Sequence, residues 1–80
     1  MRIDKFLKNA RIIKRRTVAK EACEAGRVEI NGRIAKPGDK VQLGDLIKIR
    51  FGSGDMTIKV LMIKDSVRKK DAEKMYETVN

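Results

Sequence analysis

Three consecutive cations, Lys14, Arg15 and Arg16, stand in the segment "IIKRRTVAK", between two isoleucines and a stretch with helical periodicity. Adjacent like charges repel, and a serine or threonine at the position of Arg15 would cap the helix that follows. The first backbone N–H groups of that helix lack intrahelical partners and favour an anion. Guanidinium groups bind phosphate through forked hydrogen bonds. The run therefore predicts a site where Arg15 and Arg16 bind successive phosphates.

Other cations extend this site along the chain. Arg2 precedes the first expected helix, and lysines on the polar side of that helix add screened, less directional attraction to phosphate. For Lys20 solvation alone is a sufficient explanation, and a role for Arg27 depends on how the neighbouring glycine-containing loops place it. The candidate nucleic-acid-binding residues are Arg2, Lys5, Lys8, Lys14, Arg15, Arg16, Lys20 and Arg27.

The charge of the chain is concentrated at its amino end. Eight of the twenty Lys and Arg residues lie among the first twenty positions, where Asp4 is the only acidic residue, and the net charge of the whole chain is +9. Such an asymmetry predicts a polyanionic partner, either nucleic acid or an anionic membrane. The chain has no tryptophan, no long apolar segment and no broadly apolar helix, so membrane binding is not expected. We expect a cytoplasmic protein, because no signal-peptide pattern is present and Cys23 is the only cysteine.

Catalytic chemistry is not expected. The 80 residues include no histidine, and a lone cysteine has no imidazole to activate it. Zinc-ligand spacing is also missing from the sequence. The acidic residues suit structural positions, with Asp4 in the first turn of a helix and Asp39 and Asp45 in turns. We therefore predict a protein that is not an enzyme and that uses neither a metal nor a cofactor.

The elements that position these cations follow from hydrophobic periodicity. A helical stripe near the amino end comprises Ile3, Phe6, Leu7 and Ala10, and a second comprises Val18, Ala19, Ala22 and Cys23. The second helix is predicted at about residues 16–25, with Gly26 as its left-handed stop and Cys23 as core filling.

After Gly26 the apolar period changes to two, which predicts strands. Asn31-Gly32 favours a type I′ hairpin, Pro37-Gly38 and Gly44-Asp45 favour turns, and strands are predicted in "LIKIRF" and "MTIKVLMI". A short closing helix is predicted from the spacing of Ala72, Met75, Tyr76 and Val79. The fold class is α+β, a helix pair on a small antiparallel sheet with a short C-terminal helix. Residues 1–50 are expected to form the binding motif, and residues 51–80 the closing strand and helix of the same single domain.

The aromatic and acidic residues indicate which nucleic acid is bound. Phe6 and Phe51 fall on core faces by spacing, and Tyr76 is expected to cover the sheet, so stacking on splayed bases is not predicted. Glu21 and Glu24 on the second helix would be repelled by DNA phosphates, and that helix has no Asn or Gln to contact adenine. Recognition of structured RNA through its backbone and shape is therefore favoured. A helix-turn-helix DNA-binding module and a module for an anionic protein partner are the alternatives.

Several motifs resemble the RNA-binding domain named after small-subunit ribosomal protein four. Its usual elements are R-L-D, S-R-x-x-A, G-x-V-x-V-N-G and a later G-D. The matching residues are Arg2, Ile3, Asp4, Arg16, Ala19, Gly26, Val28, Ile30, Asn31, Gly32, Gly44 and Asp45. The resemblance covers about residues 1–50 and implies the αL motif, a helix pair that binds structured ribosomal or transfer RNA. Arg15 departs from it, because most members have the capping serine at this position.

The whole chain is similar to the ribosome quality-control group within that family, which includes peptidyl-site tRNA-stabilising factors and, more distantly, small heat-shock protein fifteen. This resemblance implies a protein that binds large-subunit ribosomal RNA and peptidyl-tRNA on the stalled large ribosomal subunit. We also expect a monomer. A tailing factor, which extends the stalled chain at its carboxyl end, is an implied further partner. A general assembly factor that binds ribosomal RNA is the alternative with the same chemistry.

Overall fold

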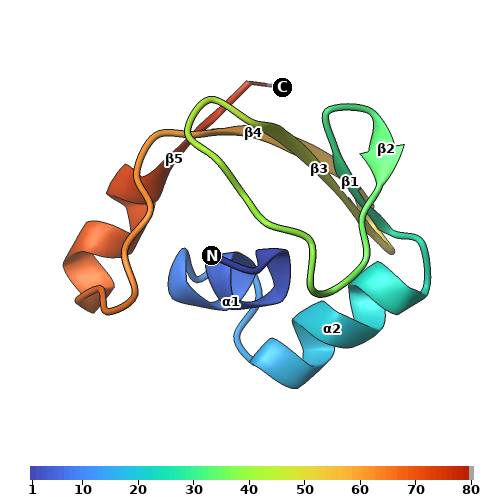
Figure 1. The fold of residues 1–80 in the computed structure, drawn as a ribbon, viewed down its shortest axis with the longest axis horizontal. Coiled ribbons are helices and arrows are strands. Elements are labelled where there is room, and N and C mark those ends of the chain that lie inside the picture. The colour runs from blue at the N-terminus through green and yellow to red at the C-terminus, as the bar shows by residue number, and fades with distance from the viewer. Residues whose placement is uncertain (80) are drawn as a thin grey trace.

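Two short helices, α1 (Ile3–Asn9) and α2 (Arg16–Glu24), open the computed structural model, which describes residues 1–79 (Figure 1). Both lie where the apolar spacing predicts them, and α2 ends one residue before its predicted limit. Val18 does not share the buried face as predicted, because its side chain is 45% exposed. The buried residues of the pair are Ile3, Asp4, Phe6, Leu7, Ala19, Ala22 and Cys23.

The chain leaves α1 through a tight left-handed turn. Arg11 has a φ of 58°, and its backbone N–H donates to the carbonyl of Lys8 at 3.0 Å. The N–H of Ile12 donates to the carbonyl of Leu7 at 3.1 Å. These two bonds form a Schellman motif, which satisfies carbonyls at the end of the helix and usually has glycine at the left-handed position. The turn returns the chain so that the start of α2 lies beside the start of α1, within reach of Asp4.

The described residues after the helices form five strands in one antiparallel sheet, with the order β2-β1-β3-β4-β5. The strands are β1 (Val28–Ile30), β2 (Arg33–Ile34), β3 (Leu46–Phe51), β4 (Gly54–Val60) and β5 (Tyr76–Thr78). The predicted left-handed stop at Gly26 and the predicted turn at Asn31-Gly32 are confirmed, because φ is 74° at Gly26, 51° at Asn31 and 84° at Gly32. Positive φ at both Asn31 and Gly32 is what a type I′ hairpin between β1 and β2 requires. The predicted α+β class is confirmed.

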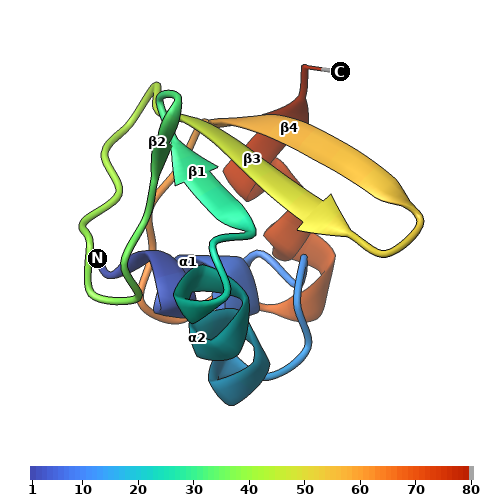
Figure 2. The ribbon, with the colours of Figure 1, turned by 90° about the vertical axis from the view of Figure 1, so that its right-hand side faces the viewer.

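The helix pair covers one face of the sheet, and the core lies between these two layers (Figures 1 and 2). Ile47 and Ile49 of β3 and Ile58 of β4 point into this core and are at most 1% exposed. Their neighbours Lys48 and Lys59 alternate to the opposite face, as the period of two predicted. The largest fully buried side chain is Phe6, so α1 is anchored by the core.

Phe51 is an exception to the predicted core. It shares the parity of Ile47 and Ile49, but its side chain is 40% exposed. The register pairs Phe51 with Gly54 at the end of the β3-β4 hairpin. Figure 2 shows that the tip of this hairpin projects beyond the helices, and Phe51 lies at the edge of the covered region, where it lines a shallow depression with Val18 and Ala22 of α2. The prediction that Phe51 is a core residue is therefore wrong. Phe51 is on the face of the sheet that was predicted, but it lies too near the end of the strand to be buried.

The carboxyl end also differs from its prediction. A 3₁₀ helix, η1 (Lys69–Met75), buries Ala72 and Met75, but Tyr76 begins strand β5 instead of continuing the helix. Tyr76 pairs with Val60 on β4, because the exposed edge of that strand offers backbone hydrogen bonds that a helix would leave unmet. β4 itself ends at Val60, so the predicted continuation of the strand through residues 61–63 is also wrong.

Residues 1–79 contain no helix that is both long and apolar enough to cross a membrane.

Candidate nucleic-acid interface

Asp4 is the centre of a small charged cluster at the paired starts of α1 and α2. Its side chain is only 3% exposed. One carboxylate oxygen, Oδ2, accepts a hydrogen bond from Nη2 of Arg2 at 3.0 Å. The other, Oδ1, accepts from the backbone N–H of Lys5 at 2.7 Å and lies 3.5 Å from Nε of Arg16. One buried carboxylate therefore holds two of the arginines that the sequence predicts to bind phosphate.

The two guanidinium groups remain available to a ligand. The side chains of Arg2 and Arg16 are 49% and 46% exposed although each contacts Asp4. A guanidinium has five N–H donors, and Asp4 uses only part of that capacity on each. Their outward donors border a hollow of about 260 Å³, which we call the Asp4 hollow. It is lined by Arg2, Asp4, Arg16, Thr17 and Lys20.

The position of Arg2 is fixed by the backbone as well as by Asp4. Arg2 forms an isolated antiparallel bridge with Lys40, and the N–H of Ile3 donates to the carbonyl of Asp39 at 2.7 Å. A Cβ at Gly38 would lie 3.9 Å from Cζ of Arg2, so the guanidinium passes close to the backbone of this loop. The turn around Pro37 and Gly38 thus supports one side of the Asp4 hollow.

Arg15 occupies the position predicted for it, immediately before α2. It has extended φ and ψ of −125° and 138°, and within the described chain its side chain makes no capping hydrogen bond. The N-terminal N–H groups of α2 therefore lack the serine or threonine oxygen that usually accepts from them at this position. The basic run divides at this point, because Arg16 lines the Asp4 hollow and Lys14 lines a different one.

That second hollow, the Arg11 hollow, lies at the other end of α1 and measures about 560 Å³. Two of the predicted residues, Lys8 and Lys14, line it. Arg11 and Lys69 also line it, although they are not among the residues predicted from the sequence. Its lining residues are Lys8, Asn9, Arg11, Lys14, Asp65, Ser66, Val67 and Lys69.

The remaining predicted residues lie outside both hollows. Lys5 forms an ion pair with Asp65 at 3.1 Å. Arg27 lines a shallow depression that also includes Val18, Arg50 and Phe51. The eight predicted residues therefore do not form one continuous cluster in the structure.

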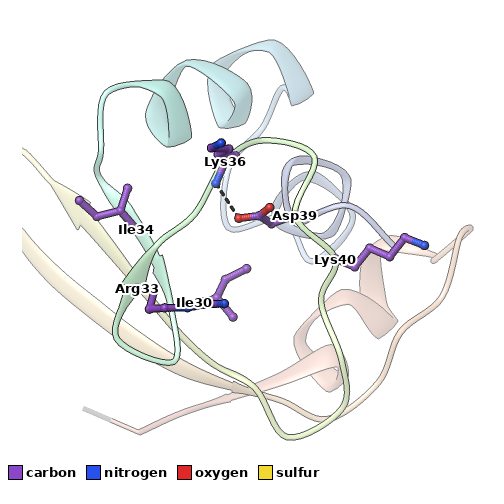
Figure 3. A pocket seen from close by; sticks show the side chains of 6 residues that line it. All are labelled: Ile30, Arg33, Ile34, Lys36, Asp39 and Lys40. Atoms are coloured by element: carbon purple, nitrogen blue, oxygen red, sulfur yellow. Dashed lines mark hydrogen bonds between the residues drawn. The ribbon is translucent and has the colours of Figure 1, made fainter.

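A further hollow of about 440 Å³ lies between the β1-β2 hairpin and the loop that follows it (Figure 3). Arg33 borders it, and Asp39 accepts a hydrogen bond from the backbone N–H of Lys36 at 2.8 Å. Asp39 holds the loop closed in this way. None of the eight predicted residues is among the described residues that line this hollow.

The role of Asp4 is what sequence reasoning missed. Its position in the sequence predicts an interaction with the helix dipole, whereas the structure makes it the common partner of Arg2 and Arg16. A signal was present, because a carboxylate two residues after an arginine at a helix start can bond to it. The contact with Arg16 depends on the fold of the α1-α2 turn, which local spacing does not reveal.

Cys23 is buried beneath this region, and burial raises the pKa of its thiol from 9.0 to about 11, with smaller contributions from Asp4, Asp39 and Glu24. Because the raised pKa favours the neutral thiol in the folded state, its contribution to the free energy of unfolding is constant below about pH 9. It should be lost as the pH rises from about 9 toward 11. We expect urea denaturation to show a steeper loss of stability for the wild type than for Cys23→Ala over this range. Parallel pH profiles would contradict this.

No group of three or more His, Cys, Asp or Glu residues within positions 1–79 is arranged to hold a metal ion.

Residues 1–47, which contain the Asp4 cluster and both helices, match the family model of the S4 domain. The chain belongs to the S4 domain family. The resemblance inferred from its motifs is thereby confirmed. Positions 48–80, which include β4, η1 and β5, lie beyond the matched S4 segment.

The chain is similar over nearly its full length to proteins called RQC P-site tRNA stabilizing factor. The protein of this name from Halalkalibacterium halodurans is 52% identical over 77 residues, which cover 96% of this chain and 88% of that protein. The one from Bacillus subtilis is 49% identical and covers 95% and 88% respectively. Similarity to the ribosome quality-control group, predicted from the sequence, is confirmed.

The fold of the chain also matches a solved structure. The trimeric structure of heat shock protein 15 from Vibrio cholerae superposes with a TM-score of 0.93 at 36% identity, covering 99% of this chain and 81% of that one. A heat shock protein 15 homolog from Aeromonas salmonicida is 35% identical over 96% of this chain, but only 59% of that protein is covered.

Proposed function

We propose that this protein is a non-enzymatic, cytoplasmic RNA-binding factor of ribosome quality control, which stabilises peptidyl-tRNA on stalled large ribosomal subunits. It contacts large-subunit ribosomal RNA and the tRNA backbone together, and a tailing factor is its expected further partner. The names of the relatives supply the biological setting. The observation that carries the proposal is the Asp4 cluster, in which one buried carboxylate directs two half-exposed arginines outward.

The chemistry of that cluster suits a phosphate backbone. Arg2 and Arg16 are held at separate points around one hollow, so their donors can engage phosphate oxygens without first losing side-chain freedom. Charge-assisted hydrogen bonds from guanidinium to phosphate are short and directional. Lys20 on the same hollow adds attraction that depends on salt.

We assign different tasks to the two parts of this single domain. Residues 1–50 supply the helix pair and its arginines, and residues 51–79 supply β4, η1 and β5, which complete the sheet. Because the core joins α1 to β3 and β4, the helix pair is rigid relative to the sheet. A rigid site recognises the shape of a folded RNA more readily than a flexible one.

Replacing Arg16 by alanine tests the site. We expect Arg16→Ala to weaken binding to large ribosomal subunits that carry peptidyl-site tRNA by about 10-fold or more, because a charge-assisted hydrogen bond contributes about 1.5–3 kcal/mol and about 1.4 kcal/mol is tenfold in affinity. Co-sedimentation with purified subunits at fixed salt measures this. Fold is retained, since the side chain is 46% exposed.

Lys59→Ala is the matched control, because it removes one cation from the sheet face opposite the helices. It should change the affinity less than twofold. Competition separates the nucleic acids: tRNA should displace the protein from subunits, and duplex DNA should not. Equal losses in Arg16→Ala and Lys59→Ala, or displacement by duplex DNA at the same concentration, would contradict the proposed function.

A further inference from the structure

The Arg11 hollow gathers four cations at the carboxyl end of α1, namely Lys8, Arg11, Lys14 and Lys69. All four are exposed. The only acidic residue among its described lining residues is Asp65, whose Oδ1 already lies 3.1 Å from Nζ of Lys5. The hollow therefore has four cations and one carboxylate, and that carboxylate also forms an ion pair with Lys5.

Two distant parts of the chain are fastened together to form this hollow. Nδ2 of Asn9 donates to the carbonyl oxygens of Lys64 and Asp65, each at 3.0 Å. These bonds tie the loop after β4 to the end of α1. Lys69 begins η1, which is anchored in turn by the buried side chains of Ala72 and Met75. Lys69 from the tail and the cations at the end of α1 consequently line the same hollow.

The conformation of Arg11 is a second, independent observation. Its φ of 58° places it at the left-handed position of a Schellman motif, where glycine is unstrained and a side chain is not. The fold thus carries an arginine where its backbone favours glycine, beside other cations that repel it. Strained backbone conformations concentrate at functional sites. An anion bound by the guanidinium would offset both the strain at Arg11 and the repulsion from the neighbouring cations.

We propose that the Arg11 hollow is a second binding site for RNA phosphates, which holds the RNA at a point separate from the Asp4 hollow. This inference rests on the proposed function, since it assigns a second contact to the same RNA-binding activity. Asp4 lies in the first turn of α1 and Lys8 lies in its last turn, so the two hollows lie at opposite ends of this helix. Binding at both sites would fix the direction in which the RNA backbone crosses α1. Lys69 lies outside the segment that matches the S4 domain, so the tail contributes directly to this second site.

The decisive variant is Arg11→Gly, because it removes the charge and relieves the backbone strain at once. We expect it to bind purified large subunits carrying peptidyl-site tRNA about fivefold more weakly while its melting temperature stays at or above that of the wild type. Lys69→Gln should weaken binding about threefold. The slope of log affinity against log salt should become shallower by about one unit for each phosphate that the variant no longer binds. Lys59→Gln, the charge control on the far face of the sheet, should change the affinity less than twofold.

The outcomes separate this inference from the proposed function. Loss of binding in Arg16→Ala together with full binding in Arg11→Gly and Lys69→Gln would overturn the second site and leave the first intact. Full binding in all variants would overturn both. A decrease in affinity for Arg11→Gly no larger than that for Lys59→Gln would likewise overturn the second site, because it would reflect net charge alone. Weakening by Arg11→Gly without thermal destabilisation supports it.

Discussion

Asp4→Asn is expected to weaken binding to large ribosomal subunits about 30-fold, although it raises the net charge of +9 by one unit. The carboxylate is the common partner of Arg2 and Arg16, at 3.0 and 3.5 Å. An asparagine in its place directs an N–H₂ group toward one of the two guanidinium groups, which is itself only a donor. Both guanidinium groups then lose the negative charge that orients them, so Asp4 acts as a positioning residue for the site.

Co-sedimentation with subunits measures this effect, and Asp71→Asn provides the matched control. Asp71 lies on η1, where it pairs with Arg68 at 3.6 Å and Lys74 at 3.4 Å, and it contacts neither Arg2 nor Arg16 in these ion pairs. Its replacement adds the same unit of charge but should leave the affinity unchanged or slightly higher. If Asp4→Asn also binds more tightly, net charge rather than the arrangement of the arginines governs binding, and the proposed role of the Asp4 cluster is wrong.

The same substitution also affects folding. A hydrogen bond to a charged group contributes about 1.5–3 kcal/mol, so Asp4→Asn should lower the free energy of unfolding by about 2 kcal/mol. The binding comparison is therefore made at a temperature at which circular dichroism shows both variants to be folded. Asp4→Glu, which keeps the charge with a longer side chain, should recover part of the binding.

Phe6→Ala is expected to lower the free energy of unfolding by about 3–5 kcal/mol, the range found when a buried aromatic side chain is truncated. Phe6 is the largest fully buried side chain and lies between the helix pair and the sheet. A domain of this size has a total stability of about 4–12 kcal/mol. The variant should therefore be marginally folded or unfolded near 37 °C, which urea denaturation at lower temperature measures.

Phe51→Ala is the control for that prediction, since it deletes the same ring at a position that is 40% exposed. It should cost about 1 kcal/mol, because a ring that is already partly exposed loses less buried area than Phe6 and leaves no enclosed cavity. Equal destabilisation by the two substitutions would contradict the position of the core described above.

Local patterns were sufficient to predict most of the framework. The stripe of Ile3, Phe6 and Leu7 identifies α1 because a helix must bury one face, and Asn31-Gly32 identifies a hairpin because few residue pairs accept two positive φ values. Arg15 is recognisable as unusual because the position before a helix is usually occupied by Ser, Thr, Asp or Asn. These signals depend only on neighbours within a few positions.

Features that depend on tertiary position were not predicted correctly. The tail has helical spacing at Tyr76 and Val79, yet Tyr76 forms a strand because its backbone pairs with the open edge of β4. Phe51 has the parity of a core residue but lies at the edge of the region that the helices cover, where it is 40% exposed. The partition of Lys14 and Arg16 between two hollows follows from the left-handed turn at Arg11, and an arginine gives no sequence signal for such a turn.

The most direct test of the central claim is sedimentation of the tagged protein from a cell lysate through a sucrose gradient at moderate salt, beside the Arg2→Ala/Arg16→Ala double variant. We predict that the wild type migrates with large subunits enriched in peptidyl-tRNA, and that the folded double variant remains near the top of the gradient. Wild-type protein in the free fractions, or equal migration of the double variant with large subunits, would contradict the proposed function.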